Sequence, residues 1–228
     1  MEEGSLFQPI DGTDSGQRAR PGEVSLAHRG VLFLDELPEF PPQALEALRG
    51  PAESGCTTVS RASAHITYPA RFQLVAAMNP CRCGHLGSSG GECSRAPRCG
   101  EDYMNRISGP LLDRIDLSLH VQPATGPELS RGPPGESSAM VASRVRQARG
   151  RQTQRGDSSN AEANPATISL SEAARTLVEQ ACDRLRLSPR GYTRVLRVAR
   201  TVADLAEAAV VQRHHVAEAL AFRIHGRS

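Results

Sequence analysis

Two adjacent carboxylates, Asp35 and Glu36, directly follow the apolar run Val-Leu-Phe-Leu at 31–34. A continuous apolar run of this kind predicts a strand buried on both faces in a parallel sheet. Parallel strands deliver their carboxyl ends to the ligand crevice of an open α/β sheet. There the first acid can hold Mg²⁺ through its water shell, and the second can orient or deprotonate an attacking water. The dipeptide also suits a plain strand-to-helix junction, since the first turn of a helix favours acids.

Four cysteines form a second candidate site in the Gly-rich loop 81–99. Cys81 and Cys83 are separated by one residue, nine residues lead on to Cys93, and five more lead to Cys99. Four thiolates suit a tetrahedral Zn²⁺ ion, and a metal would stabilise a loop that has little core of its own. Two alternatives stay open: His85 as a substitute ligand, or a set of incidental free thiols. Cys56 and Cys182 lie outside the loop and are expected to be ordinary buried residues.

The elements that must position these side chains follow from the apolar patterns. Residues 72–78 predict a second buried strand that stops at Asn79-Pro80, and Pro41 and Pro42 open a helix between the two strands. The β-branched stretch 55–69 predicts a hairpin, and the alternation through 115–121 predicts a third strand. The fold class is therefore α/β, with a core at 1–125, a linker with a basic helix at 126–166, and three helices at 167–228.

Composition excludes several classes of function. The chain of 228 residues has a net charge of +2, no Trp and 4% aromatic residues, so stacking on aromatic side chains is not its means of gripping single strands. All 27 cationic side chains are Arg, so the lysine of a Walker A phosphate loop is missing. No apolar stretch of about 18 residues is present, which predicts no membrane partner. The acidic N-terminus is unlike a signal peptide, so a cytoplasmic, reducing compartment is expected.

Several ordered segments resemble the magnesium-chelatase-like AAA+ ATPases, in particular the ComM/YifB branch, from about residue 20 to the end. The segments are RPGEVSLAH (20–28), GVLFLDELPEF (30–40), YPARF (68–72), AAMNPC (76–81), ISGPLLDRIDL (107–117), GESS (135–138) and RVLRVARTVADL (194–205). The resemblance implies a partial AAA+ P-loop-type three-layer core followed by an all-α C-terminal lid. It also implies ATP and Mg²⁺ as cofactors.

Residue roles carry over from the resemblance position by position. Asp35 matches the Walker B acid that holds Mg²⁺, Glu36 the catalytic glutamate, and Asn79 the sensor 1 residue that positions the same water. The family also implies a homo-oligomeric ring.

Three arginines match residues that act on nucleotide in the family. Arg114 matches the arginine finger that reaches the nucleotide of a neighbouring subunit, and its side chain is expected to be exposed in a single chain. Arg190 matches sensor 2, with Arg197 as the other candidate. The plainer interpretations are a surface ion pair of Arg114 with Asp113 or Asp116, and a solvated helix face for the other two.

The resemblance implies a DNA-remodelling motor, with branch migration in recombination or natural transformation. In such a ring the hairpin at 55–69 would face the channel, with Arg61 meeting phosphates; the basic helix at 137–155 is a second candidate for DNA contact. Because the family places a Walker A loop upstream of the Asp35 strand, the chain is expected to be the C-terminal part of a larger protein and inactive alone. The alternatives are a magnesium chelatase ATPase subunit for tetrapyrrole synthesis and a non-enzymatic truncated remnant.

Overall fold

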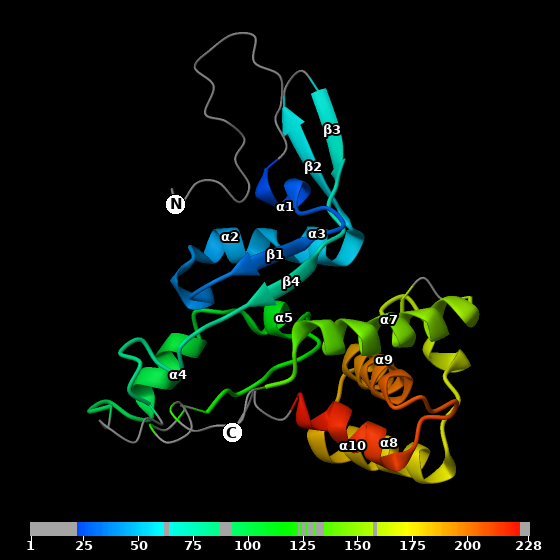
Figure 1. Ribbon diagram of the computed structural model, residues 1–228. Helices are drawn as coiled ribbons and strands as arrows, with labels where there is room; N and C mark the ends of the chain where they lie inside the picture. Colours follow the sequence, from blue (N-terminus) through cyan, green and yellow to red (C-terminus); the bar gives the residue numbers. More distant parts are fainter. Residues whose placement is uncertain are drawn as a thin grey trace. The chain divides into compact units, whose positions relative to one another are not determined.

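The computed structural model describes residues 22–61, 64–86, 93–122, 124, 126, 130, 135–156 and 159–223. The chain divides into two compact units, with the boundary between Ile115 and Asp116 (Figure 1). Within the described ranges, no helix combines the length and the apolar character needed to cross a membrane.

A two-stranded parallel sheet lies at the centre of the first unit. Its strands are β1 (Val31–Leu34) and β4 (Gln73–Ala76), in a register that pairs Val31 with Gln73 and Leu34 with Ala76 (Figure 1). Both strands are where the sequence predicts them. The prediction that β1 is buried on both faces is wrong for the described residues. Leu32 and Leu34 are buried, whereas Val31 and Phe33 are each 58% exposed. The described helices and loops cover only one face of this sheet.

Short helices connect and cover the strands of this unit. They are α1 (Glu23–Leu26), the 3-10 helix η1 (Leu37–Glu39), α2 (Pro42–Ala47) and α3 (Arg49–Ser54). As predicted, the proline pair opens a helix, and α2 begins at the second proline. The buried core of the unit consists of Val24, Leu32, Leu34, Leu37, Leu45, Leu48, Ala70, Ile107 and Leu111.

The predicted hairpin is confirmed. Strands β2 (Cys56–Arg61) and β3 (Ala64–Pro69) pair antiparallel. Gly55 joins α3 to β2 with φ of 69°, and a Cβ at that position would lie 2.7 Å from the Cγ of Arg71. This junction therefore requires glycine both for its backbone conformation and for space.

The prediction of a third strand at 115–121 is wrong. Ser108 instead caps the short helix α5 (Gly109–Leu112), and residues 113–122 form no strand. The alternating side chains Leu117, Leu119 and Val121 are 49%, 70% and 85% exposed, so no partner strand gives the alternation a buried face. The unit is mixed α/β as expected. Its only strand pairings in the described ranges are β1 with β4 and β2 with β3, so a three-layer core is not formed there. Helix α4 (Arg98–Met104) follows the cysteine-rich loop.

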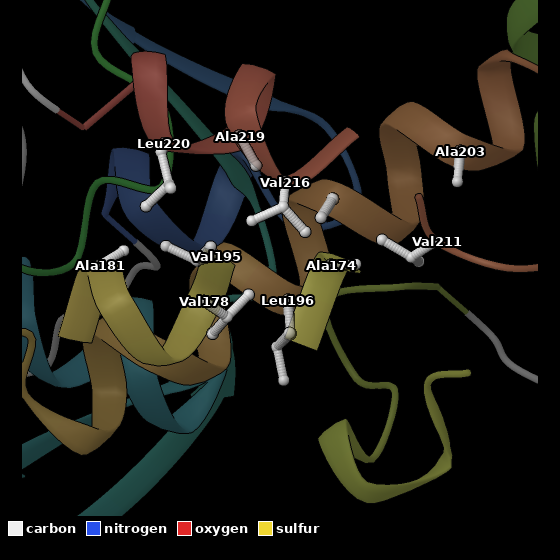
Figure 2. Packing of buried hydrophobic residues seen from close by; sticks show 11 residues of the cluster. Ala174, Val178, Ala181, Val195, Leu196, Ala203, Val211, Val216, Ala219 and Leu220 are labelled. Carbon is white, nitrogen blue, oxygen red and sulfur yellow. The ribbon is translucent and has the colours of Figure 1, made fainter. Parts of the chain in front are cut away.

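The described regular elements of the second unit are helices, apart from an isolated parallel bridge between Leu170 and Val211. The unit contains α7 (Ser138–Gln154), the 3-10 helix η2 (Pro165–Thr167), α8 (Glu172–Leu185), α9 (Pro189–Leu205) and α10 (Arg213–Ala221). Side chains of Ser137, Ser171 and Ser188 cap three of these helices by accepting backbone N–H groups. Figure 2 shows Val178, Val195 and Val216 pointing into the space that α8, α9 and α10 enclose. The three helices predicted within 167–228 are α8, α9 and α10, and the basic helix predicted in the linker is α7.

Candidate functional site

Asp35, Glu36 and Asn79 leave the parallel sheet at one edge. Strand β1 ends one residue before Asp35, and β4 ends three residues before Asn79. Two further backbone hydrogen bonds extend the ladder: Ala77 donates to Leu34 O at 2.9 Å, and Leu37 donates to Ala77 O at 3.0 Å. All three candidate side chains are exposed. The structure therefore brings the two strand ends together, as the sequence pattern predicts for parallel neighbours.

Glu36 occupies an unusual backbone conformation. Its φ of 52° and ψ of 48° lie in the left-handed region, which a glutamate rarely adopts. Its N–H donates to Asp35 Oδ1 at 2.9 Å. Such backbone strain is concentrated at functional sites. Here it turns the chain out of β1 directly at the two acids, and nothing in the sequence signals it.

This edge offers oxygen ligands, and the described residues around it form no phosphate loop. Carboxylates and an amide oxygen are the donors that Mg²⁺ accepts, usually with several retained waters. A phosphate loop holds its ligand through backbone N–H groups and a lysine. The chain contains no lysine, so the edge fits a metal and an attacking water rather than the whole nucleotide.

Arg114 is held inside the first unit, which corrects the expectation of an exposed side chain. Only 13% of the side chain is exposed; its Nη2 pairs with Glu53 of α3, and its Nη1 donates to Pro110 O at 2.8 Å. Its Nε is buried and has no hydrogen-bond partner within the described residues. The predicted alternative partners, Asp113 and Asp116, are not the ones it uses. Its actual partner, Glu53, lies 61 residues earlier, so no local sequence pattern links the two residues.

The four loop cysteines converge as predicted. The Sγ atoms of Cys81, Cys83, Cys93 and Cys99 all lie within 4.8 Å of one another. The Sγ atoms of Cys81 and Cys83 are 3.2 Å apart, and those of Cys83 and Cys93 are 3.4 Å apart. None of the four cysteines forms a disulfide. His85, the possible substitute ligand, is not one of the four residues that come together. Outside the loop, Cys56 and Cys182 are half-buried, so the prediction that they are buried residues is wrong.

Two of these thiols have opposite pKa shifts. Burial raises the pKa of Cys81, but hydrogen bonds from the Cys83 thiol and from the backbone of Leu86 outweigh it and bring the pKa to about 7. At Cys83 the backbone N–H of His85 lowers the pKa, yet the neighbouring thiols of Cys81 and Cys93 raise it to about 12. The cluster therefore combines an easily formed thiolate with a thiol that resists ionisation.

The second unit carries a shallow basic depression at the start of α9. Pro189, Arg190, Thr193, Arg194 and Arg197 line it. Arg190 is exposed. Arg197 instead donates from Nε to Ala163 O at 3.1 Å, and Arg194 pairs with Asp116 at 3.1 Å. Sequence reasoning missed Arg194, although its spacing of four residues from Arg190 places both on one helix face.

The structure describes the two predicted DNA contacts, Arg61 and the basic helix, to different extents. Arg61 is the last residue of β2, and its side chain lies outside the described part of the structure. In α7, Arg144 pairs with Glu136, Arg151 with Glu207 and Arg155 with Asp204. The two arginines at the C-terminal end of this basic helix thus pair with acids of α9 and of the turn that follows it.

Comparison with known families gives two matches that together cover most of the chain. The family described as magnesium chelatase, subunit ChlI, matches residues 10–129. The family of the C-terminal part of the same subunit matches residues 135–223.

Individual relatives extend this result. The chain is 48% identical to the uncharacterized protein YifB of Escherichia coli over 208 residues, which is 89% of this chain and 41% of YifB. It is 46% identical to the competence protein ComM of Haemophilus influenzae over 91% of this chain and 42% of ComM. A chloroplastic magnesium-chelatase subunit ChlI of rice is 37% identical over 68 residues, 30% of this chain and 16% of the rice protein. The chain spans less than half the length of the two bacterial relatives.

Proposed function

The chain belongs to the magnesium chelatase ChlI family of AAA+-like ATPases, and we propose that it supplies the Walker B, sensor and arginine-finger side of an ATPase site. The observation that carries this proposal is the parallel pairing of β1 with β4, which puts Asp35, Glu36 and Asn79 at one edge of the sheet. That edge fits Mg²⁺ and an attacking water.

Each residue has a definite part in the proposed reaction. Asp35 would hold Mg²⁺ through water, and the bound ion would supply positive charge next to the phosphates. Glu36 orients the attacking water and accepts its proton, while the amide of Asn79 fixes the position of that water. Arg114 stabilises charge on the transferring phosphoryl group bound by a neighbouring subunit. Arg190 is the proposed sensor 2 residue on a lid formed by the second unit, since Arg197 is engaged with Ala163.

We propose that the phosphate loop comes from another part of a longer protein that assembles as a homo-oligomeric ring. The bacterial relatives are more than twice as long as the regions they share with this chain. Without a loop that contributes backbone N–H groups and a lysine, this chain alone should bind ATP very weakly and hydrolyse none.

The proposed work of the ring is DNA remodelling, with the β2–β3 hairpin and Arg61 as its contact to phosphates. The match to ComM, a competence protein by name, supports this, because it covers 91% of the chain. The match to the rice chelatase subunit covers only 30%, so tetrapyrrole chemistry is the weaker alternative. A Zn²⁺ ion at Cys81, Cys83, Cys93 and Cys99 completes the proposed set of cofactors.

The proposal can be tested with a chimera in which this chain replaces the matching region of E. coli YifB. The isolated chain is expected to release no phosphate from ATP above background, whereas the chimera should hydrolyse ATP. Intact YifB in the same assay is the control that shows the conditions to be suitable. A chimera that forms oligomers yet stays inactive, next to an active YifB, would contradict the proposal, and so would turnover by the isolated chain that Glu36→Gln abolishes.

A further inference from the structure

We infer that a Zn²⁺ ion held by Cys81, Cys83, Cys93 and Cys99 fixes the segment that carries Asn79. Zinc binding stands on the geometry of the cysteines alone, whereas the significance of placing Asn79 rests on the proposed function.

The four sulfurs lie close enough to one another to share one metal ion. With Zn–S bonds of about 2.3 Å, the sulfurs of a tetrahedral site lie about 3.8 Å apart. The four Sγ atoms lie within 4.8 Å of one another, with two pairs at 3.2 and 3.4 Å, so shifts of well under a bond length would accommodate the ion. Four sulfur ligands in this geometry select zinc or iron over Mg²⁺ and Ca²⁺.

The described residues of the cysteine loop, 81–86 and 93–99, contribute no side chain to the hydrophobic core of the first unit. Cys81 and Cys93 are buried, with exposed fractions of 0% and 8%, yet neither belongs to the hydrophobic core of the first unit. The backbone N–H of Leu86 donates to Cys81 Sγ at 3.3 Å, the kind of contact that stabilises a metal-bound thiolate. The buried centre of this loop is made of sulfur, which suits a metal better than apolar packing.

The cysteine cluster is joined directly to the end of β4. Cys81 follows Asn79 by two residues. A Cβ at Gly100, the residue after Cys99, would lie 3.1 Å from Pro80 O and 2.6 Å from Leu86 Cδ2. The first turn of α4 therefore rests against the residue between Asn79 and Cys81. A metal shared by Cys81 and Cys99 would fix that contact from both sides.

Helix α4 also reaches the end of β1. Arg106, just beyond the helix, pairs with Glu39 at 2.9 Å, and burial together with the negative charges of Glu39 and Glu36 raises the pKa of Tyr103. Tyr103 is buried and shares a hydrogen bond with Glu39, three residues after Glu36. The helix that carries Cys99 thus braces both strand ends.

Metal content tests the first half of the inference. Purified chain should contain about one Zn²⁺ by elemental analysis, and Cys81→Ser with Cys83→Ser should contain almost none. The matched control is Cys56→Ser with Cys182→Ser, which should keep the ion. Wild-type chain stripped with a chelator and refilled with zinc gives the same comparison without any substitution. Iron in place of zinc, or zinc retained by the Cys81/Cys83 variant, would overturn the assignment.

Hydrogen exchange tests the second half without any nucleotide. Removing zinc from the wild-type chain should raise exchange at the amides of residues 77–79 and 81 by about tenfold or more, while exchange in strand β2 at 56–61 stays unchanged. Zinc bound at full occupancy with unchanged exchange at 77–81 would show that the metal does not fix the Asn79 segment. Because neither readout involves ATP, a failure of the proposed ATPase function would leave both results as they are.

Discussion

Replacing Arg114 with alanine in the ring-forming chimera is expected to lower ATP turnover by at least about 10³-fold, the effect typical of an arginine finger. Nucleotide binding should change little, because the guanidinium acts on phosphate held by a neighbouring subunit. In the structure the side chain is instead held by Glu53 and Pro110 of its own chain. The finger must therefore exchange Glu53 for a phosphoryl oxygen when the neighbour binds ATP. Steady-state phosphate release and nucleotide binding are the two measurements.

Glu53 provides the control that separates a catalytic from a structural Arg114. If Arg114 only anchors α3 through this ion pair, Glu53→Gln will cost as much turnover as Arg114→Ala. If Arg114 is a finger, Glu53→Gln will leave most of the turnover. Mixing Arg114→Ala with Glu36→Gln subunits should restore part of the activity, because one type of subunit pair then has a sound finger and a sound base. A mixed ring no more active than either variant would contradict action across subunits.

The second large effect is expected at Asp204, where Asp204→Asn should destabilise the second unit by about 3 kcal/mol near pH 7. The carboxylate is fully buried and accepts from Arg155 at 2.6 and 2.8 Å, from Asn160 at 2.9 Å and from Arg200 at 2.9 Å. An amide at this position would leave buried guanidinium charge without its counter-ion. Urea unfolding followed by the helical circular dichroism signal measures the difference.

The pH dependence of that difference has a definite sign. Burial raises the pKa of Asp204, but hydrogen bonds from Arg155 and Asn160 and the charge of Arg200 outweigh it, so the pKa lies below its ordinary value. The ion pairs therefore contribute fully above the unfolded-state pKa of about 3.9, and the contribution is lost as the pH falls through the lower folded-state value. The difference in free energy of unfolding between the wild type and Asp204→Asn should disappear in strong acid.

The matched control is Glu207→Gln, which removes an exposed partner of Arg151 at 2.8 Å. Its effect should stay within about 0.5 kcal/mol at any pH. If Asp204→Asn lowers the free energy of unfolding no more than Glu207→Gln does, the buried network does not stabilise the unit. The same conclusion follows if the effect of Asp204→Asn persists unchanged below pH 3.

Local sequence signals predicted most of the elements because their causes are local. The apolar runs before Asp35 and Asn79 predicted the two parallel strands, and the proline pair predicted the start of α2. The four cysteines were identifiable from spacing alone, since the chemistry of four thiols in one short loop admits few arrangements.

What the sequence did not reveal depends on contacts between distant residues. The alternation before Val121 predicted a strand, but a strand needs a partner, and periodicity carries no information about one. Glu53 lies 61 residues from Arg114, and Arg155 lies 49 residues from Asp204, so neither ion pair has a sequence signature. The left-handed backbone of Glu36 is likewise fixed by the surrounding fold rather than by the residue type.

The most direct test of the central claim is steady-state ATP turnover by the chimera with and without Glu36→Gln. The proposed base should be needed for hydrolysis but not for binding, so turnover should fall at least about 10²-fold while the affinity for Mg²⁺-ATP stays within a few-fold. Glu179→Gln, at an exposed position of α8 in the second unit, is the control and should keep most of the turnover. Equal turnover with and without Glu36 would contradict the assignment of the β1 end as the hydrolytic edge.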